Sequence, residues 1–228
     1  QRDSHDYAAQ CAAEGVTALV IQHDIDLSTL PGVTVVKVES SRYAMALMSC
    51  NLFGNPAKQM TMIGVTGTKG KTTTTHMIKS VLEAAGRKVH LGGNIGAALL
   101  PMLPEVRPED VAVVELSSFQ LISMHQSPKI AVVTNVTPNH LDHHKDMQEY
   151  IDAKRNILLY QNPPCRAVLG FENDITRGME KDCKGEQVWF TRLHETDRGA
   201  FLRESDDTLC YAENGVVTPI LPRKEIQL

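Results

Sequence analysis

The sequence lacks several features that would each point to a particular class of protein. Aromatic residues make up 5% of the chain and hydrophobic residues 42%, a balance that fits an α/β domain with an aliphatic sheet better than an all-β sandwich. Apolar runs such as 111–114 and 130–133 fall far short of the roughly 20 residues of a transmembrane helix. The 23 basic and 27 acidic residues give a formal net charge of −4, without the basic excess of a nucleic-acid-binding domain. We therefore expect neither membrane insertion nor a nucleic-acid partner.

Cysteine is also sparse and unpatterned. The five cysteines are odd in number, widely spaced and without a C-x-x-C pair, which argues against a disulfide framework and a zinc ribbon. A reducing cytoplasm is the expected location. No histidine partner is evident in the sequence for Cys50, Cys165 or Cys183, so we expect structural thiols rather than a nucleophile. The chain has neither an initiator methionine nor a secretory signal pattern, and we expect it to begin within a longer protein.

Short aliphatic runs alternate with helical or turn stretches over most of the chain. Such alternation predicts an α/β fold with a mainly parallel sheet and helices on both faces. From about Gly199 the pattern changes to short strand-like pieces with Asn214-Gly215 as a hairpin turn, so a small antiparallel appendage is expected there. Turn residues at 51–56 mark a linker. We therefore expect a partial N-terminal α/β domain over 1–57 and a larger, doubly wound domain over 58–228.

The most informative local pattern lies between a predicted strand and a predicted helix. Glycines in such a loop let backbone N–H groups surround phosphate oxygens, Lys71 can reach the β and γ oxygens, and the Thr72 hydroxyl can ligate Mg²⁺. The strict P-loop pattern would place its first glycine at Val65, where this sequence has Gly64 and Gly67 on either side. A glycine- and threonine-rich turn that caps a helix is the alternative, but the flanking strand and helix favour phosphate binding. The predicted phosphate-binding residues are Thr66, Gly67, Thr68, Lys69, Gly70, Lys71, Thr72 and Thr73.

Polar residues also follow two other predicted strands. In doubly wound sheets, ligands lie beyond the carboxyl ends of the strands. Glu115 ends the run 111–114, and its carboxylate is either a metal ligand or a strand-end charge in solvent. Asn135 follows the run 130–133. Both positions fall at the carboxyl ends of strands, so we expect them near the phosphate loop.

Histidines gather in 140–144, directly after the second of these strands. They lack the i, i+4 helical spacing of a zinc-binding helix, so structural zinc is disfavoured. We expect one histidine to contact Mg²⁺ or a phosphate while the others are solvated. Lys154, on the helix predicted over 147–160, is by spacing alone an exposed lysine.

Four motifs occur in an order that resembles the Mur ligases, the ATP-dependent amino-acid-adding enzymes of peptidoglycan synthesis. They are Gly67–Thr72, Glu115–Leu121, Thr134–Asp142 and Tyr150–Lys154. The resemblance is strong over about 58–180 and loose elsewhere. It implies that 1–57 is part of the N-terminal domain on the UDP-substrate side and that 58–228 is the central ATP-binding domain. It also implies that the C-terminal domain, which binds the incoming amino acid, is absent.

The resemblance implies catalytic roles for residues of each motif. Lys71 and Thr72 would bind ATP phosphates and Mg²⁺, and Glu115 and His140 would hold the magnesium. Lys154 would be the lysine that the family carries as a carbamate, which converts a cation into a carboxylate-like metal ligand. The cofactors implied are ATP and Mg²⁺.

Further residues are implied to support the substrate and the metal loop. Asn94 and Ser117 would help to place the UDP-sugar substrate, and Asn135 would support the metal loop. Two positions depart from the family pattern, because Asn139 stands where an aspartate is frequent and Ile122 replaces a frequent glutamate. The first departure affects either metal affinity or the groups around the metal ligands.

Different parts of the chain resemble different members of the family. Residues 92–96 and 115–121 look like the member that adds D-glutamate to UDP-N-acetylmuramoyl-L-alanine through an acyl phosphate. The opening, from 4 to 56, looks more like the member that adds diaminopimelate or lysine. We give the motif beside the chemistry the greater weight and expect D-glutamate addition by a monomeric protein. A nucleotide-binding module without ligase activity is the alternative of a different class.

Overall fold

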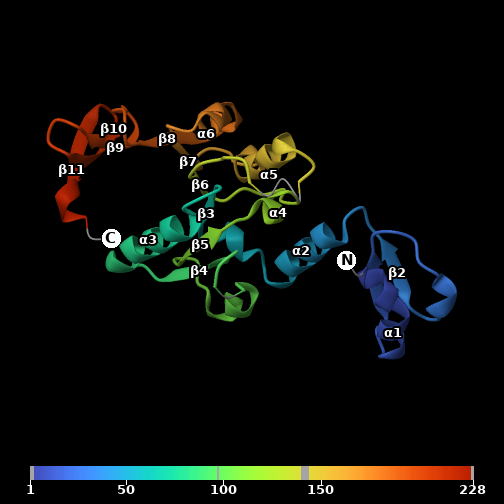
Figure 1. Cartoon of the computed structure of the whole chain (residues 1–228). Coiled ribbons are helices and arrows are strands. Elements are labelled where there is room, and N and C mark those ends of the chain that lie inside the picture. The colour runs from blue at the N-terminus through green and yellow to red at the C-terminus, as the bar shows by residue number, and fades with distance from the viewer. Residues whose placement is uncertain (1–2, 97, 140–143, 227–228) are drawn as a thin grey trace. The chain divides into compact units, whose positions relative to one another are not determined.

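The computed structural model describes residues 3–96, 98–139 and 144–226. It divides the chain into two compact units, Gln1–Asn55 and Pro56–Leu228 (Figure 1). The two units are described separately below.

The first unit is small and has little core. It contains a two-stranded parallel sheet in which Ala18 pairs with Thr34 and Ile21 with Lys37. Ser40 caps the last helix by accepting a hydrogen bond from the N–H of Tyr43. The elements are η1 (Ser4–Tyr7), α1 (Ala8–Ala13), β1 (Ala18–Ile21), η2 (Leu27–Thr29), β2 (Thr34–Lys37) and α2 (Ser41–Leu52).

The second unit is built on a nine-stranded sheet of order β11-β10-β9-β8-β7-β6-β3-β5-β4. The pairings from β4 to β9 are parallel, and those of β10 with its neighbours are antiparallel. Because β3 lies between β5 and β6, the strand order reverses around it, which makes its carboxyl end the switch point of the sheet. The strands are β3 (Thr61–Thr66), β4 (Val89–Gly93), β5 (Val111–Glu115), β6 (Ile130–Val133), β7 (Arg166–Gly170), β8 (Glu186–Thr191), β9 (Gly199–Arg203), β10 (Thr208–Glu213) and β11 (Val216–Pro222).

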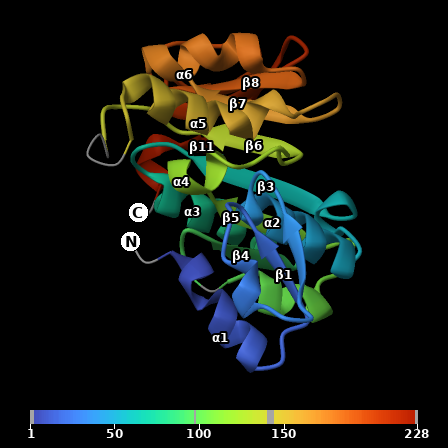
Figure 2. The ribbon, with the colours of Figure 1, turned by 90° about the vertical axis from the view of Figure 1, so that its right-hand side faces the viewer.

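Helices cover both faces of this sheet, and alternate strand residues supply two separate cores. On β6, Val132 packs in the cluster that includes Ile78 of α3, whereas Val133 packs in the cluster that includes Ile157 of α5. Figure 2 shows α5 and α6 beside β7 and β8. The predicted α/β class with a mainly parallel sheet is confirmed. The helical elements are η3 (Pro56–Lys58), α3 (Lys71–Ala84), η4 (Leu100–Glu105), α4 (Ser118–Leu121), α5 (Met147–Leu159), α6 (Asp174–Gly178), η5 (Met179–Asp182) and η6 (Arg223–Glu225).

The antiparallel strands expected after Gly199 are present, with positive φ angles of 53° at Asn214 and 78° at Gly215 in their hairpin turn. They continue the main sheet, because β9 pairs in parallel with β8. Gly199 permits this junction: a Cβ atom there would lie 1.9 Å from the carbonyl oxygen of Trp189. Among the residues that the structure describes, no helix is long and apolar enough to cross a membrane.

Candidate active site

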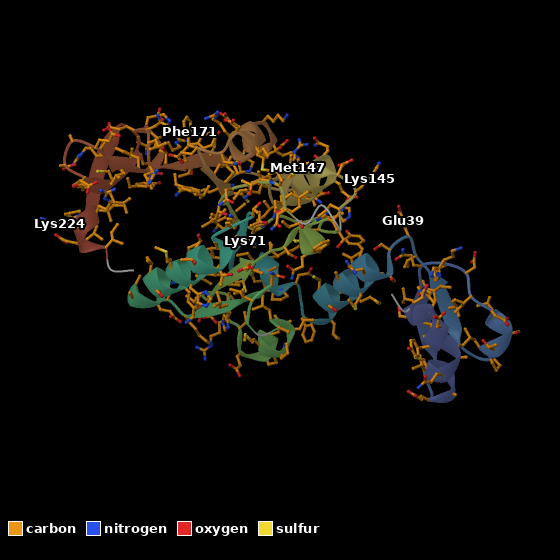
Figure 3. The ribbon with its side chains drawn as sticks, viewed as in Figure 1. Glu39, Lys71, Lys145, Met147, Phe171 and Lys224 are labelled. Carbon is orange, nitrogen blue, oxygen red and sulfur yellow. The ribbon has the colours of Figure 1, made fainter. Side chains whose placement is uncertain are left out.

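The phosphate loop follows β3 at the switch point of the sheet and leads directly into α3, which begins at Lys71 (Figure 3). Gly67 and Gly70 have positive φ angles of 148° and 79°. A Cβ atom on Gly67 would lie 2.0 Å from Oγ1 of Thr134, so the loop requires glycine there. Among the described residues no side chain caps α3 at Gly70, so the N–H groups of its first turn are available to a phosphate in the loop. Thr73 and Lys69 are exposed beside it.

Asn135 holds the loop in this shape from the neighbouring strand end. Its Oδ1 accepts a hydrogen bond of 3.0 Å from the N–H of Lys69, and its Nδ2 donates one of 2.9 Å to the Lys69 carbonyl. The Asn135 carbonyl accepts a further bond of 2.8 Å from the N–H of Thr68. Among the described residues, Asn135 therefore stabilises the phosphate loop through these hydrogen bonds.

Glu115 lies at the carboxyl end of β5 and faces the first turn of α3. The hydroxyl of Thr72 donates to Glu115 Oε2 at 2.7 Å, and Asn94 Nδ2 donates to Oε1 at 3.2 Å. Glu115 is only 2% exposed, so its reading as a strand-end charge in solvent is wrong. A buried carboxylate beside a hydroxyl and a phosphate loop is the oxygen donor set that Mg²⁺ prefers.

Lys154 is buried, with 1% of its surface exposed, and its reading from spacing as an exposed lysine is wrong. It lies on the face of α5 that packs on the sheet, one helical turn beyond Tyr150. Its Nζ donates to the Gly67 carbonyl at 3.0 Å and approaches Thr66 Oγ1 at 3.4 Å. Burial, followed by the charge of Lys71, lowers the pKa of Lys154 to about 7.

The remaining predicted residues are distributed around these groups. Ser117 caps α4 in a reciprocal capping box with Gln120. His140 lies outside the described residues. His144 is 4% exposed, so the expectation that it is solvated is wrong. Its ring lies between α4 and α5, stacked on Phe119 at a centroid separation of 4.8 Å and within hydrogen-bond distance of Ser118 and Glu149.

The motifs do not indicate two further residues, Thr134 and Asn173, which hold the phosphate loop and the segment after β6. Thr134 donates a hydrogen bond from its hydroxyl to the Lys69 carbonyl at 2.9 Å. Asn173 caps α6 and also bonds both backbone groups of Val136 at 3.2 and 3.1 Å. The signal for Thr134 was its place at a strand end, whereas the contact of Asn173 with Val136 spans 37 residues and leaves no local trace.

A separate cluster in the first unit could be mistaken for a metal site. Asp3, His5 and His23 have their ligand atoms within 4.8 Å of one another. However, His5 Nε2 accepts a hydrogen bond of 2.9 Å from the N–H of Gln22, so Nδ1 carries the proton and donates to Asp3 at 2.7 Å. Both nitrogens of His5 are thereby used, and hydrogen bonding accounts for the cluster.

Comparison with curated proteins finds relatives that share one name. The UDP-N-acetylmuramoylalanine--D-glutamate ligase of Acetivibrio thermocellus is 48% identical over 165 residues, which are 72% of this chain and 35% of that protein. The enzyme of the same name from Clostridium botulinum is 47% identical over 159 residues, or 68% of this chain and 35% of that protein. The matched regions thus span about a third of these relatives.

Solved structures agree on the fold. A UDP-N-acetylmuramoyl-L-alanyl-D-glutamate--2,6-diaminopimelate ligase superposes with a TM-score of 0.72 at 16% identity, over 95% of this chain and 50% of that one. MurF from Acinetobacter baumannii superposes with a TM-score of 0.61 at 22% identity, over 97% and 50% of the two chains. MurF from Thermotoga maritima, solved in complex with ADP, gives 0.56 at 19% identity, over 95% and 52%. Residues 65–217 match the family model of the Mur ligase middle domain, and the chain therefore belongs to the Mur ligase family.

Proposed function

We propose that this chain is part of an ATP-dependent amide ligase of peptidoglycan precursor synthesis that adds D-glutamate to UDP-N-acetylmuramoyl-L-alanine. The observation that carries the proposal is the meeting of Lys71, Thr72 and Glu115 at one edge of the sheet. They supply a cation, a hydroxyl and a buried carboxylate around one phosphate loop. The names of the curated relatives support D-glutamate as the amino acid.

The proposed reaction is an acyl-phosphate mechanism. The carboxylate of the muramoyl-alanine attacks the γ-phosphate of ATP, and ADP leaves. The amine of D-glutamate then attacks the acyl phosphate, and inorganic phosphate leaves through a tetrahedral intermediate. Lys71 and the N–H groups at the start of α3 neutralise charge on the transferring phosphoryl group. No covalent enzyme intermediate is needed in this scheme.

The donor set fits magnesium. Thr72 and Glu115 would hold the ion together with His140, and the bound ion would supply positive charge beside the phosphate oxygens. We include Lys154 as a further ligand in its carbamate form. The position of Lys154 supports this assignment, because its amine is buried against the phosphate loop and donates to the Gly67 carbonyl there. Carbon-13 NMR after incubation with labelled bicarbonate should show a carbamate signal that Lys154→Met lacks.

Two further residues are assigned to the sugar substrate. Asn94 follows β4 and bonds Glu115, while Ser117 begins α4 two residues after Glu115. Both lie at the edge of the sheet that carries the phosphate loop, which supports a role in orienting the UDP-sugar carboxylate. A monomer in the cytoplasm is part of the same proposal.

The experiment that tests the function is phosphate release by the full-length protein with ATP, Mg²⁺ and UDP-N-acetylmuramoyl-L-alanine. D-glutamate should stimulate release, and L-lysine and diaminopimelate should not. Stimulation by either of the latter without D-glutamate would reassign the enzyme within the family. Nucleotide binding without release under any of these conditions would favour a binding module.

A further inference from the structure

Tyr150 occupies the point where α5 meets the phosphate loop, 82 residues away from it in sequence. Its hydroxyl lies 3.1 Å from Oγ1 of Thr68. The Thr68 hydroxyl donates to the Thr137 carbonyl at 3.1 Å and accepts the Thr137 N–H at 3.0 Å. A threonine hydroxyl has one proton and two lone pairs, so Tyr150 must be the donor that fills the remaining lone pair.

The burial of Tyr150 keeps this donor in place. The side chain is 1% exposed, and burial raises the pKa of its hydroxyl. The phenol therefore stays protonated over the neutral pH range. A hydrogen bond from a buried side chain fixes a loop more firmly than one that is fully exposed to water.

The ring of Tyr150 has a second contact. Nζ of Lys154 lies 4.6 Å from the ring centroid, in the geometry of a cation–π interaction. Tyr150 and Lys154 are one helical turn apart on α5. Tyr150 therefore contacts the phosphate loop with its hydroxyl and Lys154 with its ring. The relative positions of these two groups are set by one side chain.

His144 also contacts the ring of Tyr150. Its imidazole meets Tyr150 edge-on at a centroid distance of 5.2 Å. His144 Nδ1 lies 3.2 Å from Glu149 Oε2, and Nε2 lies 2.8 Å from the Ser118 hydroxyl. Because an ionised carboxylate only accepts, Nδ1 carries the proton and Nε2 accepts from Ser118. The imidazole thus connects α4 to α5.

These three side chains have the order and distances of a Ser-His-Glu catalytic triad. Ser118 is only 3% exposed and His144 4%, so the hydroxyl is too deeply buried to attack a substrate. The network is therefore a structural support for Tyr150.

We propose that Tyr150 is a positioning residue, supported by His144, that fixes the phosphate loop through Thr68 and places Lys154 beside it. The proposal rests on the proposed function for its catalytic consequence. Its consequence for nucleotide binding follows from the geometry of the loop alone.

A double-mutant cycle on nucleotide affinity tests the hydroxyl contact. Calorimetry would measure binding of a non-hydrolysable ATP analogue with Mg²⁺ to the full-length protein and to Tyr150→Phe, Thr68→Val and the double variant. Tyr150→Phe should weaken binding about five-fold and Thr68→Val at least as much, because Thr68→Val also removes the hydrogen bonds to Thr137. The double variant should be no weaker than Thr68→Val, because both single changes remove the hydrogen bond between Tyr150 and Thr68. Thr68→Ser, which keeps the hydroxyl, is the conservative variant and should bind more tightly than Thr68→Val. Losses that multiply in the double variant, or no loss in either single variant, would overturn the proposal.

A kinetic comparison separates positioning from general stability. Tyr150→Phe keeps the ring and should raise KM for ATP while kcat stays within about two-fold. Tyr150→Leu should lower kcat about ten-fold, because the Lys154 side chain loses the ring that packs against it. If both variants lose kcat in proportion to a fall in Tm, the residue is only structural and the proposal fails. If the wild type releases no phosphate, the proposed function fails, and the calorimetric cycle still decides the role of Tyr150.

Discussion

The two ends of the central sheet differ in whether their buried charged side chains have partners of opposite charge. At the amino end, Asp110 precedes β5 and is paired with His90 at 2.7 Å and with Lys88 at 3.7 Å. At the carboxyl end, Lys154 and Glu115 are equally buried but contact only neutral groups among the described residues. Buried charges without opposite charges are unfavourable unless a ligand supplies them. The difference indicates that the amino end is built for stability and the carboxyl end for a charged ligand.

The largest effect should come from removing the cation of the phosphate loop. Lys71→Ala should lower kcat/KM for ATP-dependent phosphate release by about 10² to 10³-fold, because transition-state charge loses its partner. Lys79→Ala is the matched control, since Lys79 lies on the same helix and pairs with Glu83 at the surface. Near-normal turnover in Lys71→Ala would contradict the assignment of the carboxyl end.

A second prediction concerns the balance between activity and stability at Lys154. Lys154→Met should abolish ligation and yet stabilise the fold by about 2 kcal/mol at pH 7, because it removes a buried amine that contacts only neutral groups among the described residues. The folded pKa of about 7 lies below the ordinary 10.5. The cost of burying Lys154 is therefore complete below pH 7 and is relieved as pH rises toward 10.5.

Chemical denaturation at several pH values in bicarbonate-free buffer measures this effect. The advantage of Lys154→Met over the wild type should shrink as the pH increases. Lys145→Met, an exposed change nearby, should leave stability unaltered. Destabilisation by Lys154→Met throughout would show that the amine is well accommodated without a ligand.

The smallest effect on catalysis is expected at the amino end. The hydrogen bond from His90 is the main cause that lowers the pKa of Asp110 below 3.8. Asp110→Asn should reduce Tm by a few degrees at neutral pH and leave kcat unchanged. The advantage of the wild type should be complete above pH 3.8 and disappear as the pH falls through the lower folded pKa. Thermal melts across this pH range check the effect on Tm, and turnover at neutral pH checks that kcat is unchanged. A fall in kcat without a fall in Tm would contradict the distinction between the two ends of the sheet.

The sequence predicted the parts of the site that depend on local pattern. Lys71 and Thr72 were placed by the strand-loop-helix arrangement, and Glu115 by the rule that ligands lie at strand ends. The burial of Lys154 could not be read from spacing, because the face of α5 that meets the sheet is decided by packing. The contact between Tyr150 and Thr68 crosses 82 residues and depends on the topology of the whole sheet. The same limit explains why the strands after Gly199 were expected as an appendage and not as part of the sheet.

The central claim is that the carboxyl end of the sheet binds a nucleotide with Mg²⁺ and the amino end does not contribute. Calorimetry with a non-hydrolysable ATP analogue, on the full-length protein with and without Mg²⁺, tests it most directly. The account predicts magnesium-dependent binding that Lys71→Ala abolishes and Asp110→Asn leaves intact. Binding that survives Lys71→Ala, or that Asp110→Asn removes from a folded protein, would contradict it.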